Sequence, residues 1–262
     1  HLEEDTASME HLEESSLLDY NRSGVPLLEL VTEPCLRSAE DAVAFLEYMR
    51  SAYRYLGISE ADSKKGQVRC DVNISIMEED ATELGTRVEI KNVNSFSNVF
   101  DAINYEVKRQ TELKEQGRYD EVEQETRRWD EATGKTIRMR SKADAIDYKY
   151  FVEPNIPRYK ISEDWINEIR KEIPRLRDER KNEYITKYNL SEKEATVLVK
   201  EKEISDYFER VVEECGESKD ASNWISTKIL GYMNEHNLNI NEIFMTPEML
   251  GSLINLVKEG KI

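Results

Sequence analysis

The chain has 262 residues, a formal net charge of −17 at pH 7 and three cysteines, so it is long enough for a full hydrophobic core in one or two domains. Nowhere does it contain the roughly 18 consecutive apolar residues of a membrane-spanning helix, which excludes such a helix from the prediction. Cys35, Cys70 and Cys215 are odd in number and widely separated, which excludes a disulfide framework and a cysteine zinc motif.

The first predicted strand spans residues 25–33, which read VPLLELVTE with Glu29 at the centre. An unpaired carboxylate among leucines is costly to bury, so Glu29 is expected to meet a positive charge or a proton. Arg69 or Lys91 would satisfy it in a salt bridge. A magnesium ion, which prefers carboxylates together with water and phosphate oxygens, would satisfy it jointly with the acidic residues at positions 3–5. A simple acidic edge is the remaining interpretation.

The first predicted helix spans residues 38–57. Ser38 is its expected N-cap, Asp41 is expected to complete a capping box, and Gly57 ends it. The residues expected to form its buried stripe are Val43, Leu46, Met49, Tyr53 and Leu56.

Two alternating segments, residues 67–77 and 86–91, predict an antiparallel hairpin. The two-residue period of a strand sends the apolar side chains to one face and the polar side chains to the other. The polar set consists of Arg69, Asp71, Asn73, Ser75, Arg87, Glu89 and Lys91. This face is either a solvated sheet surface, as is usual in antiparallel sheets, or a functional site. Cross-strand pairs of Arg69 with Glu89, or Asp71 with Lys91, are the structural alternative.

A second helix is predicted from a cap at Asn94 or Ser95 to the neighbourhood of Gly117, and two strands, residues 124–128 and 135–140, flank a turn at Thr133 and Gly134. The helix stripe is Phe96, Val99, Phe100, Ile103 and Val107. Strands mixed with covering helices predict an α+β cradle with a mixed or antiparallel sheet.

Beyond Ile161 the pattern is helical throughout, so a cradle domain at 1–157 and an all-α domain at 158–262 are predicted, with a hinge at 154–157. The predicted helix starts are Ser162, Ser191 with Glu194, Ser205, and Thr246 with Pro247. Two stripes are expected in the core: Trp165, Ile166, Ile169 and Ile173, and Trp224, Ile225, Ile229 and Met233. Met245, Met249 and Leu253 are expected to pack between helices.

Several stretches match a known family closely. They are HLEEDT at 1–6, DYNRSGVPLLELVTEP at 19–34, RCDVNIS at 69–75, EIKNVNSF at 89–96, QETRRWDEATGKTIRMRSK at 124–142, DYKYFVEPNIP at 147–157, PRLRDERKNEYI at 174–185, SDYF at 205–208 and ASNWI at 221–225. The chain resembles, over nearly its whole length, the B subunit of the aspartyl/glutamyl-tRNA amidotransferases. Members of that family carry a further amino-terminal segment and a carboxy-terminal tail domain, so the resemblance implies a fragment.

The resemblance implies a glutamine synthetase or guanido kinase-like cradle, ATP and Mg²⁺ as cofactors, and a cytoplasmic complex without membrane attachment. The implied partners are the amidase, which is the A subunit of the complex, its small C subunit, and Glu-tRNA(Gln) or Asp-tRNA(Asn). Phosphorylation of the side-chain carboxylate by ATP would make it displaceable by ammonia from glutamine. The sequence has no G-x-x-x-x-G-K-[ST] loop, so a cradle rather than a P-loop would hold the nucleotide.

The resemblance also assigns roles to residues of this sequence. The implied metal ligands are Glu4 and Glu29; the implied catalytic residues are Asp71, Lys91 and Arg69; and the implied cofactor-binding residues are Asn73 and Glu89.

The acidic balance argues against strong tRNA binding by this chain, because phosphate-binding proteins normally present a basic face. The local basic clusters are Lys64 and Lys65, Lys108 and Arg109, Arg127 and Arg128, and the stretch from Arg175 to Lys181, each more often a solvated face than a binding site. Two other functions stay open: a module that docks partner proteins and tRNA, and a separate metal-dependent kinase or ligase with a similar cradle.

Overall fold

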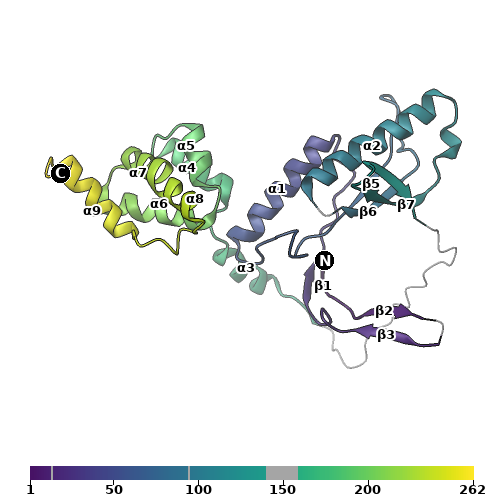
Figure 1. The fold of residues 1–262 in the computed structure, drawn as a ribbon, viewed down its shortest axis with the longest axis horizontal. Helices are drawn as coiled ribbons and strands as arrows, with labels where there is room; N and C mark the ends of the chain where they lie inside the picture. The colour runs from purple at the N-terminus through teal and green to yellow at the C-terminus, as the bar shows by residue number, and fades with distance from the viewer. Residues whose placement is uncertain (13, 94, 140–158) are drawn as a thin grey trace.

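The computed structural model describes residues 1–12, 14–93, 95–139 and 159–262. Figure 1 shows an α+β part, which contains all the labelled strands with α1 and α2, and a helical part that extends to the carboxy terminus. The predicted α+β class followed by an all-α region is therefore confirmed. The predicted hinge at 154–157 and the predicted domain boundary after residue 157 lie outside the described residues.

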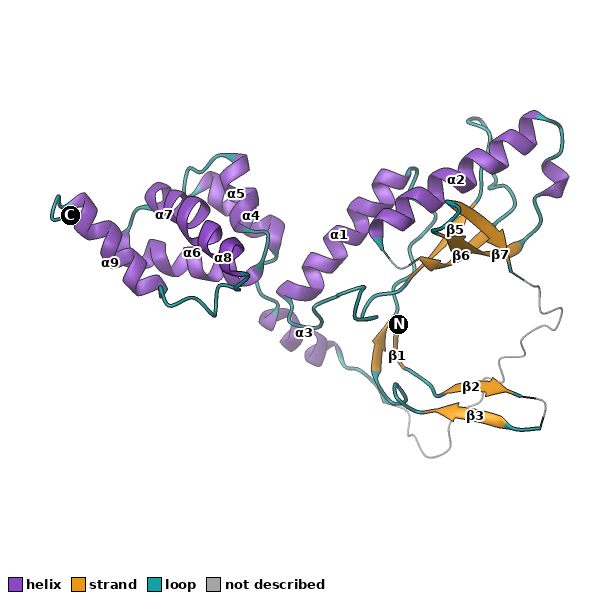
Figure 2. Ribbon diagram, in the orientation of Figure 1, coloured by secondary structure: helices purple, strands orange, loops and turns teal. Residues whose placement is uncertain are grey.

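A four-stranded mixed sheet forms the centre of the α+β part, in the order β5-β6-β7-β8; Figure 2 labels β5, β6 and β7. Its strands are β5 (Cys70–Ile74), β6 (Val88–Val93), β7 (Glu125–Asp130) and β8 (Lys135–Arg138). The pairs β5–β6 and β7–β8 are antiparallel, which confirms the predicted hairpin and the predicted strand pair around Gly134. The β6–β7 pair is parallel, because α2 crosses over between them.

A β-bulge interrupts the β5–β6 pair. Val72 lies opposite Ile90 and Cys70 lies opposite Val93, so two residues of β6, at positions 91 and 92, lie opposite the single residue Asp71. The extra residue resets the alternation. Ile90 and Val93 therefore both join the buried face with Cys70, although they are separated by an odd number of positions.

Helix α2 (Phe96–Glu115) covers one face of this sheet (Figure 1). Ser95 caps it by accepting a hydrogen bond from the N–H of Asn98 at 3.1 Å. Val99 and Ile103 are buried as predicted, but Val107 is 39% exposed. The helix instead buries two polar side chains that the apolar stripe did not include, Glu106 and Gln110.

Helix α1 (Ala39–Tyr55) packs beside α2. The hydroxyl of Ser38 accepts the N–H of Asp41 at 3.0 Å, which confirms the cap, and Gly57 follows with a positive φ of 69°. The predicted capping box is wrong, because the Asp41 carboxylate accepts the N–H of Arg37 at 3.2 Å. A 3₁₀ turn, η1 (Tyr119–Glu121), lies between α2 and β7.

Two small antiparallel ribbons precede α1. They are β1 (Leu2–Glu4) with β4 (Pro26–Leu28), and β2 (Ser8–His11) with β3 (Ser16–Asp19). The predicted strand at 25–33 is thus reduced to three residues, because its partner β1 is equally short. Residues 29–36 are exposed, so the buried salt bridge expected as one interpretation of Glu29 is not formed, and a simple acidic edge is the interpretation that fits its exposure.

The helical part contains seven α-helices and one π-helical turn within residues 159–262. They are α3 (Glu163–Glu172), α4 (Arg177–Thr186), α5 (Glu192–Leu198), α6 (Lys202–Cys215), α7 (Ser218–Trp224), the π-helical turn η2 (Ile225–Ile229), α8 (Leu230–His236) and α9 (Pro247–Lys258). Side-chain caps at Ser162, Ser191 and Thr246 confirm three predicted starts. The start predicted at Ser205 is wrong, since α6 begins at Lys202 and the Ser205 hydroxyl is buried.

The core of the helical part includes Phe208, Ile225, Leu250 and Ile254, each at most 2% exposed. The stripe that continues from Ile225 through Ile229 and Met233 is buried as predicted. The stripe on α3 is not: Trp165, Ile169 and Ile173 are about half exposed. Met249 is also exposed, contrary to the prediction.

Candidate functional site

The sheet face opposite α2 carries a row of charged side chains. Asp71 comes from β5, Glu89 and Lys91 from β6, and Arg128 from β7. The register places Lys91 directly beside Arg128 on the adjacent parallel strand. Their side chains are 42% and 44% exposed, so this polar face is open to solvent and to a ligand. Figure 1 places the two amino-terminal ribbons on the side of the sheet away from α2.

Lys91 lies between two carboxylates on this polar face. Its Nζ is 3.7 Å from an Asp71 oxygen and 3.4 Å from a Glu89 oxygen. The Thr126 hydroxyl donates to the other Glu89 oxygen at 3.0 Å. The bulge at positions 91 and 92 sets Asp71 across from Lys91, so the cross-strand pair of Asp71 with Lys91 is formed. The predicted alternative of Arg69 with Glu89 is not, because Asn73 lies opposite Glu89.

Arg69 and Asn73 lie two positions before and two positions after Asp71, but their environments differ. Asn73 is exposed on the polar face, where the register sets it beside Glu89. Arg69 is exposed immediately before β5. Within the described ranges it has no ion pair, so its guanidinium is available to a ligand but is not positioned by the fold.

The two predicted metal ligands lie on the β1–β4 ribbon. The backbones of His1 and Glu29 pair through reciprocal hydrogen bonds of 2.7 and 2.9 Å, and Glu4 lies opposite Pro26. Side chains alternate between the two faces of a strand, and Glu4 is an odd number of positions from His1. The Glu4 side chain therefore points to one face of the ribbon, and the side chains of His1 and Glu29 point to the other. The two carboxylates therefore do not converge as magnesium ligands must. The described part of the chain contains no group of three or more metal-ligating side chains.

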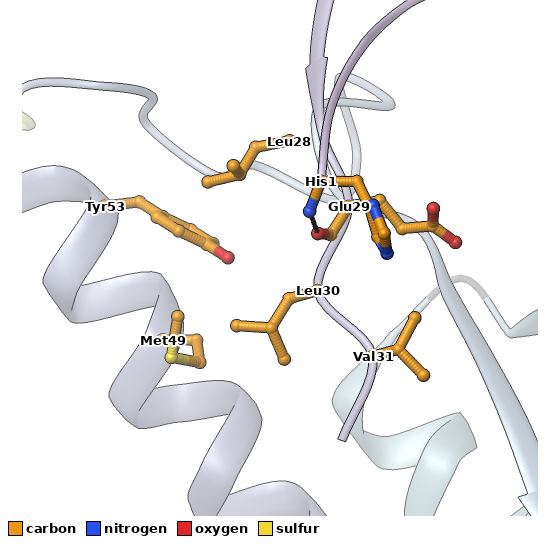
Figure 3. A pocket seen from close by; sticks show the side chains of 7 residues that line it. All are labelled: His1, Leu28, Glu29, Leu30, Val31, Met49 and Tyr53. Carbon is orange, nitrogen blue, oxygen red and sulfur yellow. Dashed lines mark hydrogen bonds between the residues drawn. The ribbon is translucent and has the colours of Figure 1, made fainter. Parts of the chain in front are cut away.

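Glu29 also borders a pocket of about 370 Å³ between residues 28–31 and α1 (Figure 3). Leu28, Leu30, Met49 and Tyr53 make this pocket largely apolar. Figure 3 shows the Glu29 carboxylate beside the His1 ring, directed away from Met49 and Tyr53. The pocket is thus separate from the polar face and lacks a set of converging charges.

Arg22 ties the amino-terminal ribbon to the start of the sheet. Its Nε is 2.8 Å from an Asp5 carboxylate oxygen, and its Nη1 donates to the carbonyl of Gly66 at 3.4 Å. Asp5 follows Glu4 directly, and Gly66 lies just before β5. This contact therefore fixes the acidic amino-terminal turn against the loop that leads into the polar face.

Cys70 lies at the edge of the site, next to Asp71. Burial, and secondly the negative charge of Asp71, raises the pKa of the Cys70 thiol to about 11. The thiol is therefore protonated at neutral pH and is neither a nucleophile nor a metal ligand there. Cys70 belongs to the core that packs under α2.

Sequence reasoning missed two residues of the polar face, Thr126 and Arg128. Both alternate with Arg127 and Trp129, so strand parity was the signal that could have found them. Arg127 leaves the other face, where it donates to Glu125 at 2.6 Å and to the Thr136 hydroxyl at 2.9 Å. The predicted basic cluster of Arg127 and Arg128 is therefore two residues with separate environments.

Several cations of the other basic clusters also form ion pairs with carboxylates of the same chain. Arg109 donates to the buried Glu106, and the Glu106 hydrogen bond and charge raise the pKa of Arg109 in spite of its desolvation. In the helical part Arg175 contacts Glu183 and Glu209, and Arg180 contacts Asp206. These cations stabilise the fold and contribute little to a basic surface.

The fold and the site define a class: an α+β domain whose sheet presents a charged, open face, joined to an all-α domain. Comparison with known families agrees with this description. Residues 1–167 match the model of the GatB/GatE catalytic domain, and residues 206–262 match the model of the GatB domain. The chain belongs to the GatB/GatE family.

Named relatives are similar over the whole chain. They are B subunits of the aspartyl/glutamyl-tRNA(Asn/Gln) amidotransferase, and the identity is 47% for that of Caldicellulosiruptor saccharolyticus, 44% for that of Thermotoga maritima and 43% for that of Brevibacillus brevis. In each case 100% of this chain is covered, but only 55% of the relative. The chain thus spans about half the length of these relatives. None of the helices described here is long and apolar enough to cross a membrane.

Proposed function

We propose that the chain is the catalytic and helical portion of the B subunit of an aspartyl/glutamyl-tRNA amidotransferase. The chain belongs to the family, and the observation that carries this proposal is its polar face. On that face Lys91 lies 3.7 Å from Asp71 and beside Arg128. In the proposed reaction the side-chain carboxylate of Glu-tRNA(Gln) or Asp-tRNA(Asn) is phosphorylated by ATP. Ammonia then displaces the phosphate. The partner amidase, which is the A subunit and assembles with the small C subunit, releases this ammonia from glutamine.

The charges of the polar face suit an anionic substrate. Phosphoryl transfer depends mainly on positioning and on neutralising the charge of the transferred group. Lys91 and Arg128 are exposed cations on neighbouring strands, and Arg69 is a third at the edge of the sheet. Asp71 and Glu89 hold the Lys91 ammonium in place, and Thr126 orients Glu89. Asn73 adds an amide that hydrogen-bonds without adding charge.

Magnesium ligation by Glu4 and Glu29 stays a prediction. Their placement on opposite faces of the ribbon does not fit a single ion, and no step proposed here depends on that pair. Bound magnesium would neutralise phosphate charge, as in other phosphoryl-transfer enzymes.

The test uses the full-length protein assembled with its partners, with formation of amidated aminoacyl-tRNA and of ADP as the readouts. Lys91→Ala and Asp71→Asn are each expected to reduce amide formation by about 100-fold or more, as loss of a charge-stabilising group does elsewhere. Lys108→Ala is the matched control, because Lys108 is a 75% exposed lysine on α2 with an ordinary helical ion pair. Full activity of both site variants would refute the assignment of the polar face.

A second function, docking of partner proteins, is favoured by the amino-terminal ribbons. Leu2, Met9, Leu17 and Leu18 are all at least 50% exposed there. Met9 and Leu18 lie opposite each other and share one face of the β2–β3 ribbon. Neighbouring exposed apolar side chains are typical of an interaction site. The first function predicts that Lys91→Ala lowers turnover by about 100-fold or more in a complex that still assembles, whereas docking alone predicts no dependence on Lys91.

A further inference from the structure

Tyr55, the last residue of α1, is only 2% exposed. The α1 positions that sequence periodicity predicts to be buried, such as Met49 and Tyr53, are partly exposed. Tyr55 is therefore buried by something other than the sheet that α1 accompanies. Figure 1 shows the carboxy-terminal end of α1 meeting the helical part.

The Tyr55 hydroxyl enters a hydrogen-bonded cluster made by α5 and α6. It donates to the carbonyl of Val199, the C-cap of α5, at 3.0 Å, and lies 2.9 Å from the Ser205 hydroxyl of α6. The Ser205 hydroxyl is also 2.9 Å from the carbonyl of Leu198. Carbonyls at the end of a helix lack partners within it, so Tyr55 and Ser205 satisfy groups that would otherwise be buried and unpaired.

The Tyr55 ring contacts a cation that is itself fixed. The Arg180 guanidinium of α4 lies 5.5 Å from the ring centroid. Arg180 is 6% exposed and donates to Asp206 at 2.6 Å, and it lies 3.6 Å from Glu209. A cation desolvated in this way interacts more strongly with an aromatic ring than an exposed one does. The Tyr55 side chain is thus held at both its ring and its hydroxyl by three helices of the other part.

We propose that Tyr55 is the anchor that fixes the orientation of the helical part relative to the sheet that carries the polar face. Tyr55 is a positioning residue in this role, because it acts on the arrangement of two parts and not on a ligand. The anchor itself does not depend on the proposed function. Its consequence does: a fixed helical part would hold a bound tRNA at a set distance from the phosphoryl-transfer site.

The test measures the distance between the two parts by pulsed electron spin resonance on the full chain. Spin labels are placed at Asn104→Cys on α2 and Glu235→Cys on α8, both exposed positions, in a Cys35→Ser background. Tyr55→Phe removes only the hydroxyl and Ser205→Ala removes its partner, whereas Tyr55→Ala removes the ring as well. Tyr53→Phe is the control, because Tyr53 lies on the same helix but lines the open pocket.

A single narrow distance distribution is expected for the wild type and for Tyr53→Phe. It should broaden in Tyr55→Phe and in Ser205→Ala, with no further broadening in the double variant, since the two hydroxyls form one cluster. An unchanged distribution in Tyr55→Phe and Ser205→Ala would overturn the anchor. If Tyr55→Ala does not fold, these two conservative variants still decide the question.

A kinetic readout tests the consequence in the assembled enzyme. Tyr55→Phe is expected to raise the KM for aminoacyl-tRNA severalfold and to leave the KM for ATP unchanged. A broadened distance distribution with an unchanged KM for aminoacyl-tRNA would overturn the positioning role in the reaction. Failure of the proposed function is distinguishable from both, because the wild-type complex would then form no amidated tRNA.

Discussion

Arg127 and Arg128 are adjacent in sequence, yet strand parity gives them different tasks. Arg127 is 13% exposed and lies among Glu106, Glu125 and Thr136 under α2. Arg128 lies on the open polar face, where its nearest carboxylate is Asp130 at 3.3 Å. A basic dipeptide therefore supplies one structural cation and one that is exposed to a ligand.

Arg127→Ala should lower the free energy of unfolding by about 3 kcal/mol, because it leaves carboxylates without one of their buried partners. Urea denaturation followed by circular dichroism measures this loss. Arg128→Ala is the matched control and should cost less than about 1 kcal/mol, as expected of an exposed ion pair. In the assembled enzyme the same Arg128→Ala should lower amide formation about tenfold or more. Equal stability losses for the two variants would contradict the assignment of faces.

Cys70 offers a chemical reporter of the charge on Asp71. Burial and the Asp71 carboxylate raise the pKa of the thiol to about 11, so its alkylation by iodoacetamide should be slow at pH 8 and accelerate near pH 11. Asp71→Asn should move that acceleration to lower pH. Mass spectrometry of the alkylated peptides measures the rate, with the exposed Cys35 as an internal reference. The same pH profile in both proteins would show that the thiol does not sense Asp71.

The residues of the polar face could be predicted because alternation is a local property of a strand. Asp71, Asn73, Glu89 and Lys91 share a face as expected. The setting of Glu29 could not be predicted, since burial depends on which distant segments cover a strand. Its apolar neighbours suggested a core strand, but in the structure the ribbon pairs over only three residues and the rest is exposed.

Among the helices, side-chain caps are the elements best foreseen from the sequence, because a cap depends on residues within four positions. Ser95, Ser162, Ser191 and Thr246 cap helices as predicted. Ser205 has a cap-like residue type but a tertiary role, because its hydroxyl meets Tyr55 from a segment 150 residues away. Contacts over that separation leave no local pattern.

The capping box of α5 should make helix stability depend on pH. The Ser191 hydroxyl, and then the Ser191 N–H, hydrogen-bond the Glu194 carboxylate and lower its pKa from the ordinary 4.5, with help from Lys219 and against a small desolvation effect. The unfolded state therefore binds the proton more readily than the folded state. The stabilisation is present above pH 4.5 and is lost as the pH falls through the lower, folded-state pKa.

Ser191→Ala removes this box and should lower the free energy of unfolding by about 1 kcal/mol at neutral pH. The difference in the free energy of unfolding between the variant and the wild type should shrink as the pH falls, because protonation of Glu194 weakens the capping box of the wild type. Denaturation at pH 7 and pH 3 provides the comparison. A difference that stays constant across this range would mean that the charge of Glu194 does not contribute.

The register of the β1–β4 ribbon predicts how the chain meets divalent ions. Since Glu4 and Glu29 leave opposite faces, they cannot jointly ligate one ion, and titration calorimetry with Mn²⁺ should give the same weak binding for the wild type and for Glu4→Gln with Glu29→Gln. Binding that disappears in the double variant would contradict the register of the ribbon and support the metal pair that the family resemblance implies.

At the scale of the whole molecule, the net charge of −17 and the pairing of its cations determine its behaviour toward nucleic acid. Arg109, Arg127, Arg175 and Arg180 all contact carboxylates, so few of the predicted basic clusters form a surface. A dissociation constant for tRNA on the order of 10⁻⁴ M or weaker is expected at physiological salt, the weak end of non-specific binding. Fluorescence anisotropy with labelled tRNA measures it, and submicromolar affinity would contradict this view of the surface.

The overall class, an α+β region followed by helices, followed from the change of hydrophobic period along the chain. The arrangement of the two regions did not. It depends on Tyr55, whose burial cannot be deduced from α1 alone. Likewise, the half-exposed apolar stripe of α3 could not be told from a buried one by its periodicity. Periodicity predicts that one face of a helix is apolar. It does not predict which other element packs against that face, because this depends on the complete tertiary structure.

The bulge opposite Asp71 determines how each strand of the β5–β6 pair would respond to the loss of a residue. Deleting residue 92 would restore a regular ladder in which Val93 still lies opposite Cys70 on the buried face. Deleting Asp71 would instead make Cys70 and Val72 neighbours, and adjacent residues of a strand point to opposite faces, so one of the two would leave the core. The two strands therefore differ in their tolerance of a one-residue deletion at the same point of the ladder.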